Sequence, residues 1–135
     1  MQERAKQRLQ IQNKIRDTEG KLITKAMELI DSKQPFLSME ENQIRNVLDV
    51  ALMTDCVEVV DVYIKYQIGR SKPNEKWRFS NFGDSLIIQI KELKEKAKEI
   101  ADFLKIKTDM DPIWLQLTRL YLGHLNRYFY YRKKE

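Results

Sequence analysis

The sequence has almost none of the residues with which proteins build disulfides and most zinc sites. Cys56 and His124 are the single cysteine and the single histidine among 135 residues. One cysteine cannot form a disulfide within the chain, so we expect the reducing environment of the cytoplasm. A zinc site needs at least three protein ligands, usually Cys and His. We therefore expect no disulfide, no metal site and no cofactor.

Glycine, proline and long apolar runs are also scarce. The chain has four Gly and three Pro, whereas a β-sandwich needs a turn about every 8–12 residues. No run of 18 apolar residues occurs, so no membrane span is expected, and residues 1–8 lack the apolar core of a secretory signal. With 33% charged and 42% hydrophobic residues, the composition is that of a folded, helical protein.

Apolar residues recur at spacings of three and four in five segments, which predicts five helices. The first runs from residue 2 to about 32, with Gly20 leaving a kink between two helices open. The second follows a capping box formed by Ser38 and Glu41. The third begins after Thr54 or Asp55 and ends at Gly69, although its β-branched residues would also suit a strand. The last two cover about residues 84–105 and 113–133.

These segments predict an all-α protein, a bundle of about five helices in a single domain of residues 1–135. Residues 1–12 are sparsely apolar and could project from the body. Residues 70–82 form the longest segment without a helical pattern. A loop of that length in a small domain is usually functional or disordered.

The acidic pairs that could perform acid–base chemistry have simpler explanations in the sequence. The capping box accounts for Glu40 and Glu41, and helix entry accounts for Asp109 and Asp111. His124 lies on an apolar face without a Ser, Cys or acidic partner nearby in the sequence, which favours a core or rim histidine.

Cys56 also favours a structural role. The neighbouring acidic residues Asp55 and Glu58 oppose any lowering of its thiol pKa, so a small buried residue is the better interpretation. We expect no enzymatic activity.

Charge is distributed in blocks along the chain. The net charge is +4 over residues 1–25, −5 over residues 36–62 and +4 over residues 63–78. Such blocks suit the binding of a polyanion on one face and the joining of copies through complementary faces. The alternative is that these charges only solvate helix surfaces.

Aromatic residues are interleaved with basic ones in the 70–82 segment and near the C-terminus. Cations for phosphates beside aromatic planes for bases are typical of single-stranded nucleic-acid binding. For the aromatic residues themselves, packing of the loop onto the core by Trp77, Phe79 and Phe82 is the favoured alternative. The candidate nucleic-acid-binding residues are Lys65, Arg70, Lys72, Lys76, Trp77, Arg78, Arg127 and Arg132.

Self-association is the second expectation drawn from charge. Asp55, Glu58 and Asp61 are spaced by three residues and form a slanting acidic strip on the third predicted helix. The basic N-terminal helix or the basic loop could be the opposing face, so that copies meet head to tail. We expect this association to be weak for the free protein, to be strengthened by RNA and to be weakened by salt.

The segment Tyr63-Ile64-Lys65-Tyr66-Gln67-Ile68-Gly69-Arg70, which ends a helix before a basic aromatic loop, resembles the small all-helical subunits of type III CRISPR effector complexes. The resemblance covers about residues 38–131. It implies a non-catalytic antiviral-defence subunit present in several copies, which stacks along the guide–target RNA duplex and contacts other subunits. The alternative is a helical protein–protein adaptor without a nucleic-acid role.

Overall fold

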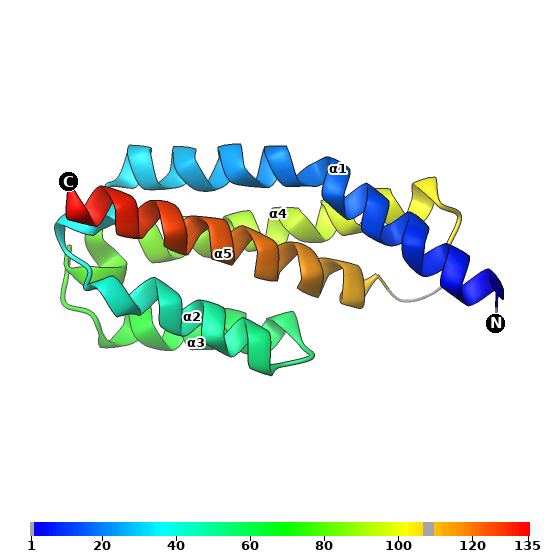
Figure 1. The fold of residues 1–135 in the computed structure, drawn as a ribbon. Helices are drawn as coiled ribbons and strands as arrows, with labels where there is room; N and C mark the ends of the chain where they lie inside the picture. The colour runs from blue at the N-terminus through cyan, green and yellow to red at the C-terminus, as the bar shows by residue number, and fades with distance from the viewer. Residues whose placement is uncertain (1, 107–109) are drawn as a thin grey trace.

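The computed structural model describes residues 2–106 and 110–135, and within them every regular element is a helix (Figure 1). This confirms the all-α prediction and excludes the strand alternative for the third segment. The elements in chain order are α1 (Gln2–Lys33), the short 3-10 helix η1 (Pro35–Leu37), α2 (Glu41–Met53), α3 (Val57–Arg70), the 3-10 helix η2 (Lys76–Asn81), α4 (Phe82–Phe103) and α5 (Asp111–Lys134).

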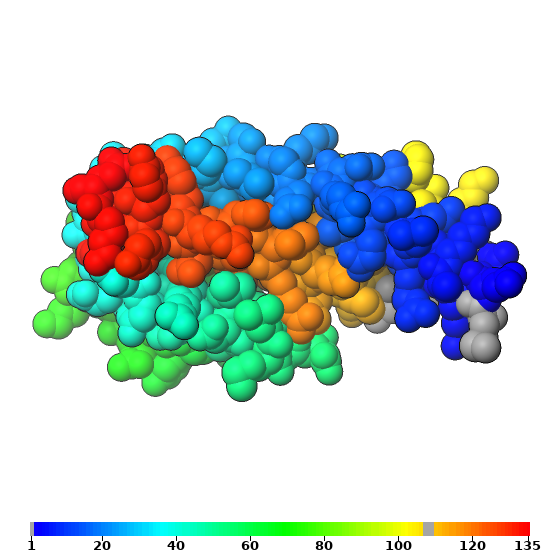
Figure 2. All heavy atoms as spheres, viewed as in Figure 1, coloured from blue at the N-terminus to red at the C-terminus, as the bar shows by residue number. Residues whose placement is uncertain are grey.

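The C-terminal helix α5 lies between the other long helices. It packs against α1, α2 and α4, while α3 lies on the far side of α2 and contacts α4. Leu117, Tyr121, Leu125 and Phe129 follow one another at intervals of four, so they share one face of α5, and all four are fully buried. Burying side chains of this size contributes about 1.5–3 kcal/mol each. Figure 2 shows α5 as an orange-to-red band between α1 and α2.

The first helix continues through Gly20 as one element, so the two-helix alternative is wrong. Its first buried residue is Ile15, and none of the described residues before it is buried. The start of this helix is therefore sparsely packed, with Ile11 half-buried against the core and Gln12 bonded to Gln116 on α5.

The start of the second helix differs from the predicted capping box. The N-cap of α2 is Glu40, whose backbone N–H donates to Oε1 of Gln43 at 2.8 Å. Ser38 lies outside the helix because η1 ends at residue 37, and its hydroxyl accepts the backbone N–H of Lys76 at 2.8 Å. The capping box exists, but it is shifted by two residues.

The third helix also begins and ends beyond the predicted residues. Its N-cap is Cys56, whose N–H donates to Oγ1 of Thr54 at 3.2 Å. Gly69 lies inside α3 with a negative φ, because the helix continues to Arg70. At the other end of the bundle, Met110 is the N-cap of α5, and Asp109 lies outside the described residues.

The segment 70–82 is an ordered connection and not the long loop that the sequence predicts. Trp77 and Phe82 are buried, and their ring centroids lie 5.9 Å apart. Backbone N–H groups of η2 are satisfied by nearby side chains: that of Trp77 donates to Ser71 Oγ at 3.3 Å, and that of Ser80 donates to Asn74 Oδ1 at 3.2 Å. The packing explanation for the loop aromatics is confirmed for Trp77 and Phe82.

The close approach of this connection to α3 explains the glycine at position 83. A Cβ atom there would lie 2.5 Å from Cγ1 of Ile68 and 2.9 Å from the carbonyl oxygen of Trp77. The carbonyl belongs to the backbone and cannot rotate away, so only glycine fits without a shift of η2.

A half-buried arginine joins α5 to the end of α2, and its removal should destabilise the fold. The Arg119 guanidinium donates from Nε to the carbonyl of Ala51 at 2.8 Å and from Nη2 to that of Thr54 at 2.9 Å. Arg119→Ala should lower the free energy of unfolding by about 1.5–3 kcal/mol, because hydrogen bonds from a charged donor are lost at helix-end carbonyls. Urea unfolding followed by circular dichroism measures the change.

Arg127→Ala on the same helix is the matched control, because Arg127 is exposed and makes no hydrogen bond within the described residues. Its effect should stay within about 0.5 kcal/mol. Equal effects of the two variants would contradict the structural role of Arg119.

Candidate nucleic-acid interface

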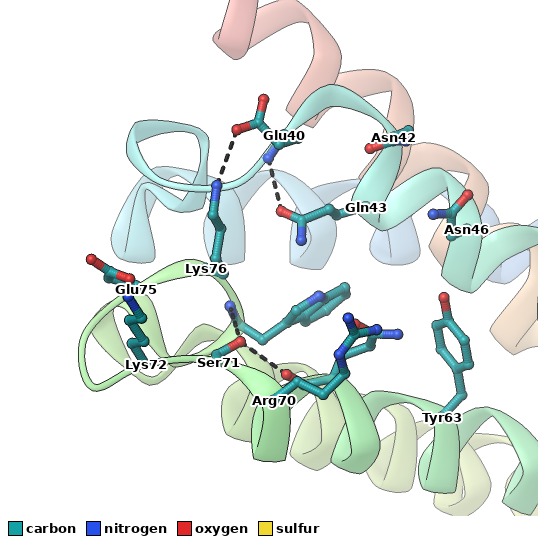
Figure 3. Close-up of a pocket in the computed structure, with 12 residues that line it drawn as sticks. Glu40, Asn42, Gln43, Asn46, Tyr63, Arg70, Ser71, Lys72, Glu75 and Lys76 are labelled. Atoms are coloured by element: carbon teal, nitrogen blue, oxygen red, sulfur yellow. Dashed lines mark hydrogen bonds and ion pairs between the residues drawn. The ribbon is translucent and has the colours of Figure 1, made fainter.

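A polar hollow of about 520 Å³ lies between α2, the end of α3 and the connection to α4 (Figure 3). Its position follows from Ser38 and Glu40, which hold the connection against the start of α2 through Lys76. We call it the α2–α3 hollow. It is lined by Glu40, Asn42, Gln43, Asn46, Tyr63, Gln67, Arg70, Ser71, Lys72, Glu75, Lys76 and Trp77.

The chemistry of this hollow is that of hydrogen bonding and not of apolar enclosure. Four amide side chains line it, and each offers both a donor and an acceptor. In Figure 3, Tyr63 and Arg70 rise from α3 toward Asn46 on α2. Amides that can donate and accept hydrogen bonds, an aromatic ring and an exposed guanidinium are therefore gathered in one place, the residue types used to bind bases and phosphates.

The predicted cations differ in whether they already have a partner within the chain. Arg70 and Lys72 are exposed and form no ion pair within the described residues, although the Arg70 guanidinium lies 5.4 Å from the centre of the Tyr66 ring. Lys76 is paired with Glu40 at 3.0 Å, and this hydrogen bond and charge lower the pKa of the Glu40 carboxyl. Arg78 donates from Nε to the carbonyl of Ile68 at 2.8 Å, so one of its donors is already used.

A second hollow, of about 400 Å³, lies on the other side of the start of α2, against α5. We call it the α2–α5 hollow. Asn42 lines both hollows, so they meet on the exposed face of α2. The second hollow contains Arg127, which the sequence predicts, together with Arg45 and Tyr130.

Arg45 is a candidate that the sequence did not indicate. It is exposed, and no ion pair is formed by it in the part of the chain that the structure describes. It is the one basic residue in the acidic block 36–62, so the net charge of −5 for that block gives no sign of a basic residue there. Only the packing of α2 beside α5 brings Arg45 to the same hollow as Arg127.

Lys65, Arg78 and Arg132 line neither hollow, and Trp77 lines the α2–α3 hollow only as a buried residue. Trp77 is 1% exposed and cannot stack on a base, so its assignment to the interface is wrong. Arg132 bonds to Asp31 and lies 4.6 Å from the centre of the Phe36 ring, which ties α5 to the end of α1. Lys65 lines neither hollow and forms an ion pair with Asp61 at 2.8 Å.

The two residues weighed for catalysis or reactivity also have defined partners. His124 Nε2 lies 2.8 Å from Oε2 of Glu19 on α1, which confirms a rim histidine and supplies an acidic partner from a distant part of the sequence. Cys56 is exposed, so its prediction as a buried residue is wrong. Its thiol donates to Glu58 Oε1 at 3.1 Å, and this bond lowers the pKa of the Glu58 carboxyl.

The predicted acidic strip is only partly available. Asp55 and Glu58 are exposed at the start of α3, whereas Asp61 is half-buried and held by Lys65. The strip therefore presents two carboxylates to solvent and not three.

In the described ranges no group of three or more His, Cys, Asp and Glu side chains is arranged to hold a metal ion. None of the helices in those ranges has the length and hydropathy needed to cross a bilayer. No protein-family model matches the chain, and neither does any curated protein or solved structure.

Proposed function

We propose that the protein is a non-catalytic RNA-binding subunit of a type III CRISPR ribonucleoprotein, and that RNA lies across the exposed start of α2. The observation that carries the proposal is the pair of hollows that meet at Asn42. Between them they present Arg45, Arg70, Lys72 and Arg127, four exposed cations without an ion pair among the described residues.

The arrangement of cations, amides and aromatic rings across α2 is compatible with a bound RNA strand. Cations lie on both sides of α2, where they can bind successive phosphates, and amides lie between them, where they can bond to base edges or ribose hydroxyls. Tyr63 and Tyr130 provide one ring in each hollow, and rings can stack on bases.

The cytoplasmic complex proposed here would contain several copies of this subunit along the guide–target duplex, with cleavage performed by other subunits. This part of the proposal is supported by the resemblance of residues 63–70 and by the net charge of +5. A helical adaptor is the second candidate, and the exposed apolar residues on α3 favour it.

The proposal predicts salt-dependent binding of single-stranded RNA without cleavage. If the four cations contact phosphates, the logarithm of the association constant should fall with the logarithm of salt concentration with a slope of about −3, since each contact to a single strand contributes about −0.7. Fluorescence anisotropy with a labelled RNA of mixed sequence measures this slope.

The same RNA, incubated with the protein and Mg²⁺ or Mn²⁺, should remain intact on a denaturing gel. An adaptor would show no binding at low salt. Cleavage that is lost in a His124→Ala variant would contradict the non-catalytic assignment.

A further inference from the structure

The outward face of α3 carries a stripe of large apolar side chains. Val59, Val62 and Tyr66 are 47%, 63% and 59% exposed, and their spacings of three and four place them along one side of the helix. The opposite side of α3 is buried in the bundle through Val57, Val60 and Ile64, so the stripe is additional to the core. Contiguous exposed apolar side chains on a small protein commonly mark an interaction surface.

Two exposed charges of opposite sign border this stripe, and each already has a partner within the chain: the Cys56 thiol donates to Glu58, and Lys65 pairs with Asp61 at 2.8 Å. Glu58 and Lys65 are seven residues apart, which is two helical turns, so they lie on the same edge of α3. Glu58 precedes Val62 by four residues and Lys65 follows it by three. Val59 precedes Val62 by three and Tyr66 follows it by four. Glu58 and Lys65 therefore lie at nearly equal distances along α3 on either side of Val62, and so do Val59 and Tyr66.

We infer that α3 pairs in antiparallel orientation with α3 of a second copy of this chain, around a two-fold axis at Val62. A two-fold axis that relates antiparallel helices keeps the same edge of each helix together. Glu58 then faces Lys65 of the partner subunit, and Val59 faces the partner's Tyr66. A parallel two-fold pairing would instead place the edge with Glu58 and Lys65 against the partner's edge with Val59 and Tyr66, so these charges would not be paired.

None of Glu58, Val59, Val62, Lys65 and Tyr66 lines either hollow, and the stripe touches the α2–α3 hollow only where the Arg70 guanidinium lies 5.4 Å from the centre of the Tyr66 ring. The pairing therefore does not depend on RNA binding, and it assigns Lys65 to a protein contact. It also differs from the head-to-tail association predicted from sequence, in which the acidic residues meet the basic N-terminal helix or the basic loop. One helix pair buries less than a standard interface of about 1,600 Å², so the dimer is weak and concentration-dependent.

Disulfide trapping tests the position of the axis. In a Cys56→Ser background, Val62→Cys places two thiols across the axis, where the Cβ atoms can approach the distance of about 4 Å that a disulfide requires. Leu9→Cys in the same background is the matched control, because Leu9 on α1 has the same exposure of 63%. Under mild oxidation the position-62 variant should form covalent dimers at least several-fold faster than the control.

Equal rates for the two variants would overturn the pairing. A mixture of the two that yields mainly cross-links between positions 62 and 9 would also overturn it, in favour of the head-to-tail arrangement.

A charge exchange tests the orientation. Glu58→Lys and Lys65→Glu each convert two attractive pairs into repulsive ones, so each should weaken dimerisation in sedimentation velocity by roughly ten-fold, given about 0.2–1 kcal/mol for each exposed pair. The variant with both changes restores opposite charges across the axis, and its dissociation constant should return to within about three-fold of the original. A double variant that dimerises no better than the single ones would contradict the antiparallel pairing.

Discussion

Replacing Trp77 with alanine should lower the free energy of unfolding by about 3–5 kcal/mol, the cost of truncating a large buried aromatic residue. The indole is 1% exposed, packs against Phe82 and is held in place by the bond from its backbone N–H to Ser71. Its loss would leave a cavity where η2 meets the start of α4. A small domain with a total stability of about 5–15 kcal/mol would lose a large fraction of it.

Urea unfolding of the Trp77→Ala variant, followed by far-ultraviolet circular dichroism, measures this loss. Tyr131→Ala is the control, because Tyr131 is 62% exposed, and its effect should stay below about 1 kcal/mol. An equally small effect at Trp77 would mean that its ring lies at the surface, as a base-stacking residue would.

The second large effect is expected on RNA affinity. Replacing Arg45, Arg70 and Arg127 with alanine removes three of the four exposed cations of the two hollows. At 0.1 M salt each phosphate contact contributes about 0.7 to the base-10 logarithm of the association constant. Loss of three contacts should therefore lower the affinity for single-stranded RNA by about 100-fold. The fold should be unaffected, since these side chains form no ion pair in the described residues.

A second triple variant controls for net charge. Arg16, Lys91 and Lys98 are also exposed and form no ion pair among the described residues, and they lie on α1 and α4 away from both hollows. Their replacement by alanine changes the net charge equally. It should lower the affinity several-fold at most, because distant charges are screened beyond about 10 Å at 0.1 M salt. Equal losses in the two triple variants would show that binding follows overall charge and not this surface.

The number and type of the helices could be predicted from the sequence because they depend on periodicity within each segment. Leu117, Tyr121 and Phe129 recur with the helical period and are all buried. The scarcity of Gly and Pro was equally informative, since it excluded folds that need many turns.

Helix termini were harder to predict because several polar residues compete for the same role. Ser38 is a residue type that commonly caps helices, but η1 places its hydroxyl next to the backbone N–H of Lys76. The N-cap of α2 is Glu40 instead. The burial of Trp77 likewise depends on η2, whose backbone is held by hydrogen bonds to nearby side chains such as Asn74. No periodic pattern in the sequence reveals these bonds.

The candidate interface could be predicted only where its residues are neighbours in sequence. Arg70 and Lys72 are close together and were found. Arg45 and Arg127 are far apart in sequence and come to one hollow through the packing of α2 on α5, so Arg45 was missed. The same packing supplies Glu19 to His124.

A salt titration of RNA binding by the original protein and by the variant without Arg45, Arg70 and Arg127 tests the proposed interface most directly. The slope of the logarithm of affinity against the logarithm of salt concentration counts the phosphate contacts that each protein makes. We predict a slope of about −3 for the original protein and a slope shallower by about 2 for the variant, at about 0.7 for each cation. Identical slopes, or no measurable binding by the original protein at low salt, would contradict an RNA interface on this face of α2.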